Sequence, residues 1–401
     1  MDEIIARITS EDPNRSLPQL LSMPLGLDVW ESKPERLVLR ATEAVLDRIG
    51  KMGYRVEPVV PVSEHLTTFA TSAATDGFHS GESLEQDMRE LAARRPELVE
   101  IKEIGRSLEN RPILALRIGE RKAGVRKLLF MGCHHAREWL AVKVPFLLAR
   151  ELIERADEAP IAGWLGKGEI WIAPMVNPDG HAFCRGHNRL WRKNRRPNPD
   201  GSFGVDPNRN YGYMWGVLNI NTSSHVPSDD TYIGPRAFSE PETRAIRDLV
   251  AAEKFAGLIT YHSYSQLILY PWGYTVDEIV DPVDRAALSG LAKDMAGPIK
   301  AVHGVAYVPE QSSQLYRTAG DTTDWTYGTY AIPSFTIELR PSSAEEGGFV
   351  VPASQIEPTY QENRAAAFLL IDRLLSSGAA RPAGLTRSAS KRPRRAVKEG
   401  G

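Results

Sequence analysis

Apolar and polar positions follow one another along the chain in a pattern that predicts alternating strands and helices over most of its length. Continuous apolar runs such as residues 128–131 suit strands that are covered on both faces. Apolar residues spaced three or four apart, such as Leu84, Met88 and Leu91, predict amphipathic helices. This alternation favours the α/β fold class, with a mixed twisted sheet sandwiched by helices.

The predicted elements of this larger part can be assigned to residue ranges. Strands are predicted at 99–105, 112–119, 127–134, 169–176, 257–263 and 333–340, and helices within 80–98, 138–156, 241–253 and 358–375. Ser83 and Gln86, at the spacing of a capping box, predict the start of the first helix.

A small α+β unit precedes this part of the chain. The pattern within residues 27–61 indicates three strands and one helix, at 27–31, 35–41, 54–61 and 42–53, with Thr42 as the helix N-cap. Residues 61–80 are rich in Ser, Thr, Ala and Gly without a sustained period, which predicts an exposed linker. We therefore place a boundary near residue 75, so that the α+β unit and its linker occupy 1–75.

The chain ends in a strongly basic segment, residues 379–401, that has no apolar period. Such a composition predicts a disordered, solvated tail, although a basic tail could also contact nucleic acid or anionic lipid. Residues 76–378 then form the main domain.

Composition limits the partners that can be expected. Lys+Arg 49 against Asp+Glu 51 gives a net charge of −2 over 401 residues, so no overall charge attracts nucleic acid or an anionic membrane. No apolar stretch approaches the roughly 20 residues that span a bilayer, and the opening residues lack the pattern of a signal peptide. We expect a monomer without nucleic-acid or membrane partners. It would be cytoplasmic by default, and secreted if the start is truncated or export is unconventional.

The sharpest local motif is CHHAREW at 133–139, between an apolar strand and a helix. His135 and Glu138 are three residues apart, so a tight turn can bring an imidazole and a carboxylate onto one cation. A catalytic zinc takes three protein ligands of these types and leaves a position for water. His262, at the end of another apolar strand, is the candidate third ligand, although alone it would suit a core histidine.

Several other polar residues could be either functional or simply exposed to solvent. Glu338 lies late in an apolar strand, where a solvent-facing position is the plain alternative. Arg192 belongs to a run of cations and aromatics that would suit a solvated face. Arg209 follows Asn208 in a stretch with glycines and a proline, a rigid turn able to aim a guanidinium at a carboxylate. The two cysteines, Cys133 and Cys184, suit buried apolar positions rather than a disulfide scaffold.

Eight segments extend these motifs in one order along the chain. They are HHAREW, NPDGHAF, NRLWRKNR, GVDPNRN, HSYSQLILYPWGYT, LYRTAGDTTDW, FTIELR and GFVVPASQI. Together they resemble the zinc metallocarboxypeptidases of the carboxypeptidase A/B type, with a likeness to the bacterial carboxypeptidase T group, over about residues 80–375. The resemblance implies that 76–378 is a zinc carboxypeptidase catalytic domain acting on the C-termini of peptides and proteins.

The resemblance also implies a role for each matching residue. His135, Glu138 and His262 would hold one Zn²⁺ per chain, Glu338 would be the general base and acid, and Arg192 would polarise the scissile carbonyl. In the substrate site, Asn208 and Arg209 would grip the terminal carboxylate, Arg137 would line the approach, and Tyr316 would close over the bound C-terminus.

Side-chain preference rests on the segment after Tyr316. In the resembling enzymes an aliphatic residue or an Asp at the position of Thr323 separates apolar from basic preference. Asp321 stands two positions earlier and could pair with a basic side chain, while Leu267 and Leu269 offer apolar surface. This predicts mixed specificity, unless Asp321 is held by a neighbouring turn and never meets substrate.

Two other functions compete with an ordinary carboxypeptidase. One is a related peptidase acting on γ-glutamyl links of cell walls or polyglutamate tails, which the set Asn208, Arg209 and Tyr316 disfavours. The other is a non-catalytic peptide-binding module, which predicts the loss of a ligand or of the base. The 27–61 unit resembles a pro-segment that lies across the active site, but it occurs here without an export signal. It could therefore also be a permanent structural domain.

Overall fold

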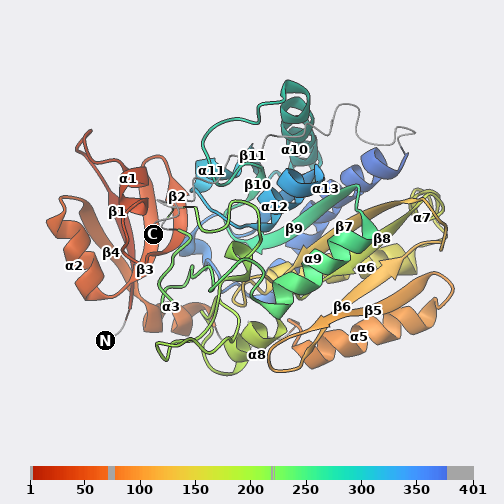
Figure 1. The fold of residues 1–401 in the computed structure, drawn as a ribbon, viewed down its shortest axis with the longest axis horizontal. Helices are drawn as coiled ribbons and strands as arrows, with labels where there is room; N and C mark the ends of the chain where they lie inside the picture. Colours follow the sequence, from red (N-terminus) through yellow and green to blue (C-terminus); the bar gives the residue numbers. More distant parts are fainter. Residues whose placement is uncertain (1–2, 71–76, 218–219, 221, 377–401) are drawn as a thin grey trace, which may run out of the picture.

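Two sheets organise the computed structural model, which describes residues 3–70, 77–217, 220 and 222–376 (Figure 1). A four-stranded sheet belongs to the N-terminal unit, and an eight-stranded sheet forms the centre of the main domain. The predicted boundary near residue 75 and the basic tail at 379–401 lie outside the described residues. None of the described helices is long and apolar enough to cross a membrane.

The eight-stranded sheet is mixed and has the order β11-β10-β12-β9-β7-β8-β6-β5. Its strands are β5 (Val99–Arg106), β6 (Pro112–Ile118), β7 (Arg126–Gly132), β8 (Gly168–Ala173), β9 (Gly257–Ser263), β10 (Leu267–Tyr270), β11 (Val308–Gln311) and β12 (Ser334–Leu339). The neighbouring central strands β12, β9, β7 and β8 run parallel, so their carboxyl ends meet at one edge of the sheet.

Helices cover both faces of this sheet, as the figure also shows (Figure 1). They are α5 (Gly81–Arg94), α6 (Leu140–Glu154), α7 (Ile161–Leu165), α8 (Pro178–Gly186), α9 (Pro241–Glu253), α10 (Pro282–His303), α11 (Ser312–Leu315), α12 (Thr322–Tyr330) and α13 (Ile356–Ser376), with short 3-10 turns η1 (Pro207–Arg209), η2 (Ala344–Glu346) and η3 (Ala353–Gln355). Leu128 and Phe130 belong to a core with α5, α6, α10 and α13. Leu129 and Met131 belong to a second core with α9 and α12. Because successive strand residues point to opposite faces, this division confirms the predicted sheet sandwiched by helices.

The N-terminal unit has the predicted three strands and helix, and one further strand that the sequence pattern did not predict. Its elements are β1 (Ile4–Thr9), α1 (Leu17–Leu21), β2 (Asp28–Lys33), β3 (Arg36–Ala41), α2 (Glu43–Lys51), β4 (Arg55–Pro61) and α3 (Val62–Phe69). β1 lies inside the sheet, because the strand order is β2-β3-β1-β4.

Two local expectations are wrong. Val62–Phe69 forms helix α3 rather than an exposed linker, and its His65 is buried with a hydrogen bond to Gly347 O of 3.2 Å. Helix α5 begins three residues earlier than predicted, because Ser80 rather than Ser83 is its N-cap and these two serines form the capping box. Long-range packing on the main domain explains the first error, since nothing in the local sequence shows what α3 covers.

Candidate metal centre and substrate site

The carboxyl ends of β12, β9 and β7 bring the predicted zinc residues together. Glu338 of β12 lies opposite His262 of β9 in the parallel register, and β7 ends at Gly132, three residues before His135. A Cβ on Gly132 would lie 1.9 Å from Ala141 O, so only glycine lets the start of α6 come this close to the strand.

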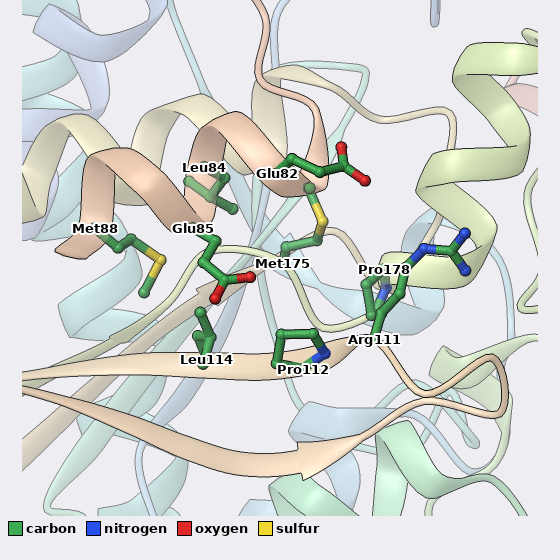
Figure 2. A pocket seen from close by; sticks show the side chains of 10 residues that line it. Glu82, Leu84, Glu85, Met88, Arg111, Pro112, Leu114, Met175 and Pro178 are labelled. Carbon is green, nitrogen blue, oxygen red and sulfur yellow. The ribbon is translucent and has the colours of Figure 1, made fainter.

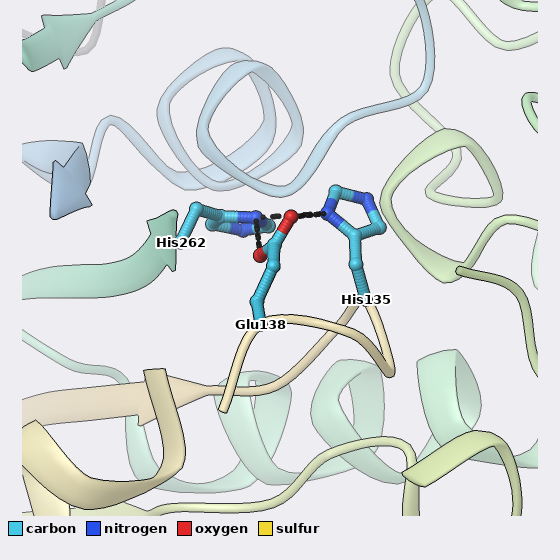
Figure 3. Close-up of side chains that lie close together, drawn as sticks. All are labelled: His135, Glu138 and His262. Carbon is cyan, nitrogen blue, oxygen red and sulfur yellow. Dashed lines mark hydrogen bonds and ion pairs between the residues drawn. The ribbon is translucent and has the colours of Figure 1, made fainter. Parts of the chain in front are cut away.

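His135, Glu138 and His262 are buried and point at one another (Figure 3). Glu138 Oε1 lies 2.7 Å from His135 Nδ1, and Glu138 Oε2 lies 3.1 Å from His262 Nδ1. The two imidazole Nδ1 atoms are 3.1 Å apart, and ligand atoms of all three residues lie within 4.8 Å of one another. The structure thus converges three potential ligand atoms on one point.

These three residues fit a divalent zinc ion. Burial lowers the pKa of His262 and so favours the neutral imidazole, which is the form that ligates metal. Buried Glu138 Oε2 has no described partner other than His262 Nδ1 at 3.1 Å, and a cation between these two atoms would satisfy both. Two histidine nitrogens and one carboxylate are a ligand set of catalytic zinc sites.

Asp206 contacts both His135 and Arg192. No role for this residue was predicted from the sequence. Its Oδ1 lies 3.2 Å from His135 Nε2, and its Oδ2 accepts hydrogen bonds from Arg192 Nε and Nη2 at 3.0 and 2.9 Å. Although burial favours its neutral form, Arg192 and His135 hold the pKa of Asp206 well below its usual range. A carboxylate on the far nitrogen of a ligand histidine fixes the ring and its tautomer. Its position in the recognised segment GVDPNRN is the signal that could have identified it.

Glu338 and Arg192 line the same cavity as two of the candidate metal ligands, His135 and Glu138. The lining includes His135, Glu138, Tyr316 and Tyr264. Burial and the nearby Glu138 carboxylate raise the pKa of Glu338, while Arg192 and Arg209 oppose this effect. The structure therefore brings Glu338, Arg192 and Tyr316 together with the metal ligands.

Asn208 and Arg209 occupy η1, directly after Asp206. Both side chains are buried, and Arg209 donates from Nε to Thr222 O at 2.7 Å and from Nη1 to Asn208 O at 2.9 Å. Arg209 and Arg192 both favour the charged form of Tyr316, but burial raises the pKa of that phenol overall. Tyr316 and Arg192 line the same cavity.

Asp321 is hydrogen-bonded to Thr323 and to the backbone of helix α12, to which Thr323 belongs. Asp321 is the N-cap: its Oδ1 accepts from Asp324 N at 2.9 Å and from Thr323 Oγ1 at 3.0 Å, and its Oδ2 accepts from Thr318 Oγ1 at 2.9 Å. Neither residue belongs to the lining of the cavity around the metal ligands. Leu267 lies opposite Glu338 in the sheet, and Leu269 lies opposite Thr336, so both leucines share the face of Glu338.

Arg137 is fully buried beneath the N-terminal unit. Asp28 of β2 accepts from its Nη1 and Nη2 at 2.7 and 2.6 Å, and the Arg137 guanidinium lies 3.9 Å from the centre of the Phe349 ring. Val29 and Trp30 of the same strand line the cavity that contains Glu338. Strand β2 thus contributes to the wall of the cavity that contains the candidate metal ligands.

A second cavity lies between the start of α5, the start of β6 and the N-terminal end of α8 (Figure 2). Its labelled lining combines apolar side chains with charged residues at the rim: Glu82, Leu84, Glu85, Met88, Arg111, Pro112, Leu114, Met175 and Pro178. It shares no lining residue with the cavity around the metal ligands.

The arrangement matches proteins whose class is known. Residues 84–366 match the zinc carboxypeptidase family, peptidase M14. The chain is 34% identical over 291 residues to carboxypeptidase B of Astacus astacus, covering 71% of this chain and 93% of that protein. It is 31% identical over 388 residues to carboxypeptidase B of Bos taurus, covering 90% of this chain and 91% of that protein.

A solved structure agrees with these relatives. The crystal structure of carboxypeptidase A from Helicoverpa armigera superposes with a TM-score of 0.80 at 26% identity, covering 92% of this chain and 98% of that chain. The chain belongs to the zinc carboxypeptidase family. It is a metallocarboxypeptidase, a zinc-dependent hydrolase of the C-terminal bonds of peptides.

Proposed function

We propose that this enzyme releases single amino acids from peptide C-termini, with one zinc ion on His135, Glu138 and His262 and with Glu338 as the general base. The observation that carries this proposal is the pairing of Glu338 with His262 on adjacent parallel strands, beside the other two ligands. Bound zinc acidifies water and polarises a carbonyl group. The chain contains all three proposed metal ligands and the proposed general base, which disfavours a non-catalytic peptide-binding module.

The two charged side chains Glu338 and Arg192 of this cavity each have a role that their charge explains. The Glu338 carboxylate takes the proton of the attacking water and delivers it to the leaving amine. The Arg192 guanidinium, oriented by Asp206, faces the negative charge that develops on the carbonyl oxygen. Because Asp206 also contacts His135, one carboxylate orients both a metal ligand and this cation.

Exopeptidase action needs a fixed group that recognises the free terminal carboxylate. We assign Asn208 and Arg209 to this task and Tyr316 to closure over the bound residue. The described contacts of Arg209 use Nε and Nη1, which supports a ligand role for the Nη2 edge. This set favours ordinary peptides over γ-glutamyl links as substrates.

We further propose mixed specificity, for apolar and for basic C-terminal residues. Asp321 and Asp324 are buried near each other, and no described Lys or Arg forms an ion pair with either. Burial and Asp321 raise the pKa of Asp324, although Gly273 N and Tyr274 N donate to this carboxyl group, and a cationic substrate side chain nearby would favour its charged form. Leu267 and Leu269 supply apolar surface on the face of Glu338.

For residues 1–75 we propose a pro-segment that restricts access to the site. The Asp28–Arg137 ion pair and the position of Val29 and Trp30 at the cavity support this proposal. Arg137, assigned to the approach of the substrate, already binds a carboxylate of the N-terminal unit.

Turnover of N-blocked dipeptides tests the proposed function. The purified chain is assayed uncut and after cleavage within residues 62–80, with and without a chelator, and the released amino acid is identified. We expect release of the C-terminal residue that the chelator abolishes and added zinc restores. Absence of turnover in both forms of the zinc-loaded protein would contradict the proposal, as would release that is insensitive to the chelator.

A further inference from the structure

The side-chain amide of Asn208 is held from one side by a single residue of helix α12. Asn208 Oδ1 accepts a hydrogen bond from Thr322 N at 3.0 Å and another from Thr322 Oγ1 at 2.7 Å. Thr322 is fully buried, and it is the first residue of α12. The two donors fill both lone pairs of the amide oxygen.

These two bonds decide which way round the Asn208 amide lies. A backbone N–H donates and cannot accept, so the atom that faces Thr322 N must be the oxygen. The amide is planar, and its NH₂ group is therefore directed away from α12. Among the described residues none accepts a hydrogen bond from Asn208 Nδ2, which leaves two donor hydrogens for a ligand.

The Thr322 hydroxyl also joins the carboxylate-recognition residue to the metal centre. Thr322 Oγ1 lies 3.2 Å from His134 Nε2, and the same nitrogen lies 2.9 Å from the Tyr211 hydroxyl. His134 precedes the ligand His135, and its ring stacks on that of the ligand His262 at 5.4 Å between centroids. Thr322 thus lies between Asn208 and the residues that pack behind the metal ligands.

We propose that Thr322 is a positioning residue that sets the Asn208 amide with its NH₂ toward the substrate, so that the enzyme binds a terminal carboxylate. The inference rests on the proposed function, because it takes Asn208 as a ligand of that carboxylate. An NH₂ group donates to a carboxylate, whereas a reversed amide would place its oxygen against the negative charge. Thr322 therefore acts on the affinity for free acids and not on the chemistry of bond cleavage.

Thr322→Val tests this inference, because valine keeps the shape of threonine and removes only the hydroxyl. The kcat and KM of blocked dipeptide free acids are measured on the full chain, uncut and after one protease treatment common to all variants. We expect KM to rise about fivefold with kcat nearly unchanged, since one of two bonds to the amide oxygen is lost. Thr322→Ser, which keeps the hydroxyl, should restore the wild-type KM. Inhibition by the corresponding dipeptide amide, which carries no charge, should not weaken.

Thr326→Val is the matched control. Thr326 is equally buried on the same helix, but its hydroxyl bonds to Ser334 Oγ at 2.6 Å and to Thr322 O at 2.9 Å. Thermal unfolding and zinc content are measured for every variant. If Thr322→Val does not fold, Thr322→Ala against Thr322→Ser makes the same comparison. Equal KM values in the two valine variants, or no rescue by serine, would overturn the inference.

Asn208→Ala separates this inference from the proposed function. If Asn208→Ala raises KM and Thr322→Val does not, Asn208 binds the carboxylate and the positioning role of Thr322 is wrong. If Asn208→Ala leaves KM unchanged, the proposed role of Asn208 fails and the inference fails with it.

Discussion

Asp206 and Asp28 show how single carboxylates organise the buried charges of this enzyme. Asp206 pairs with Arg192 and contacts His135, while Asp28 pairs with Arg137 and lies 3.1 Å from Arg40 Nε. A buried charge without a partner costs several kcal/mol, so each of these arginines is stable only with its acid in place. Arg192, proposed to face the scissile carbonyl, is thus held in place by Asp206 within the main domain.

Loss of one ligand should release the metal. In His262→Ala the site keeps one histidine and one carboxylate, fewer than the three protein ligands of a catalytic zinc site. We expect the purified variant to contain little zinc and to show no turnover, as measured by metal analysis and by dipeptide assay. His303→Ala, which removes a half-exposed histidine bonded to Glu362, is the control that should retain zinc. Full zinc content in His262→Ala would contradict the ligand assignment.

Replacing Glu338 should separate metal binding from chemistry. Glu338→Gln keeps the size of the side chain, but the amide cannot take a proton from water. We expect normal zinc content and thermal stability with kcat lower by about 10²–10⁴-fold. Glu310→Gln serves as the control, since Glu310 is also partly buried in this sheet but lies on strand β11. Near-normal kcat in Glu338→Gln would refute the role of general base.

At the scale of elements, the sequence predicted the strands and helices that have a regular local pattern of apolar residues. It missed those whose place depends on residues far away in the sequence. The apolar runs predict strands that end near Gly132, Ser263 and Leu339. Because these three strands are parallel neighbours in the sheet, their ends bring His135, Glu138, His262 and Glu338 together. β1 was missed because its six residues do not alternate strictly and only the pairing with β3 and β4 shows its central place.

Helix α10 was also missed, although its buried positions Asp284, Leu288, Ala292, Met295 and Ile299 recur at helical spacing. The face contains an acid and an alanine, and Pro298 lies inside the helix, so the pattern is weak. In the structure the Tyr327 hydroxyl donates to Asp284 Oδ2 at 2.9 Å, a partner 43 residues away in the sequence. Asp28 and Thr322 likewise gain their roles from partners that no local pattern indicates.

The N-cap of α12 allows a test of specificity that leaves the helix intact. Asparagine caps helices as well as aspartate does, so Asp321→Asn removes charge and keeps the cap. For substrates that end in Lys or Arg, we expect kcat/KM to fall because transition-state binding weakens by about 1–3 kcal/mol. For substrates that end in Phe or Leu, we expect kcat/KM to be unchanged. Asp281→Asn makes the same exchange at the N-cap of α10 and should alter none of them. An equal loss for all four substrates would show that Asp321 is structural.

At the scale of the whole molecule, the N-terminal unit and the main domain share one buried interface. Trp30 packs edge-on against Phe349 at 5.1 Å between centroids, and Ile5, Val38, Leu190 and Tyr264 belong to the same apolar cluster. Within this interface lie the Asp28–Arg137 pair and the bond from Ala344 N to Glu31 Oε1 at 2.5 Å. If the unit is a pro-segment, as proposed, access to the metal centre depends on the stability of this interface.

Asp28→Ala should open this interface and raise the activity of the uncut chain. It leaves Arg137 buried without its acid, which destabilises the docked state by about 3–5 kcal/mol. We expect kcat/KM for blocked dipeptides to rise at least tenfold, toward the value reached after cleavage within residues 62–80. Asp47→Ala removes an exposed acid of the same unit, whose ion pair among the described residues is with Lys51 of its own helix, and it should change nothing. If clean removal of the unit leaves activity unchanged while the main domain stays folded, the unit is a passive accessory domain, because an inhibitory contact cannot be lost without a gain in turnover.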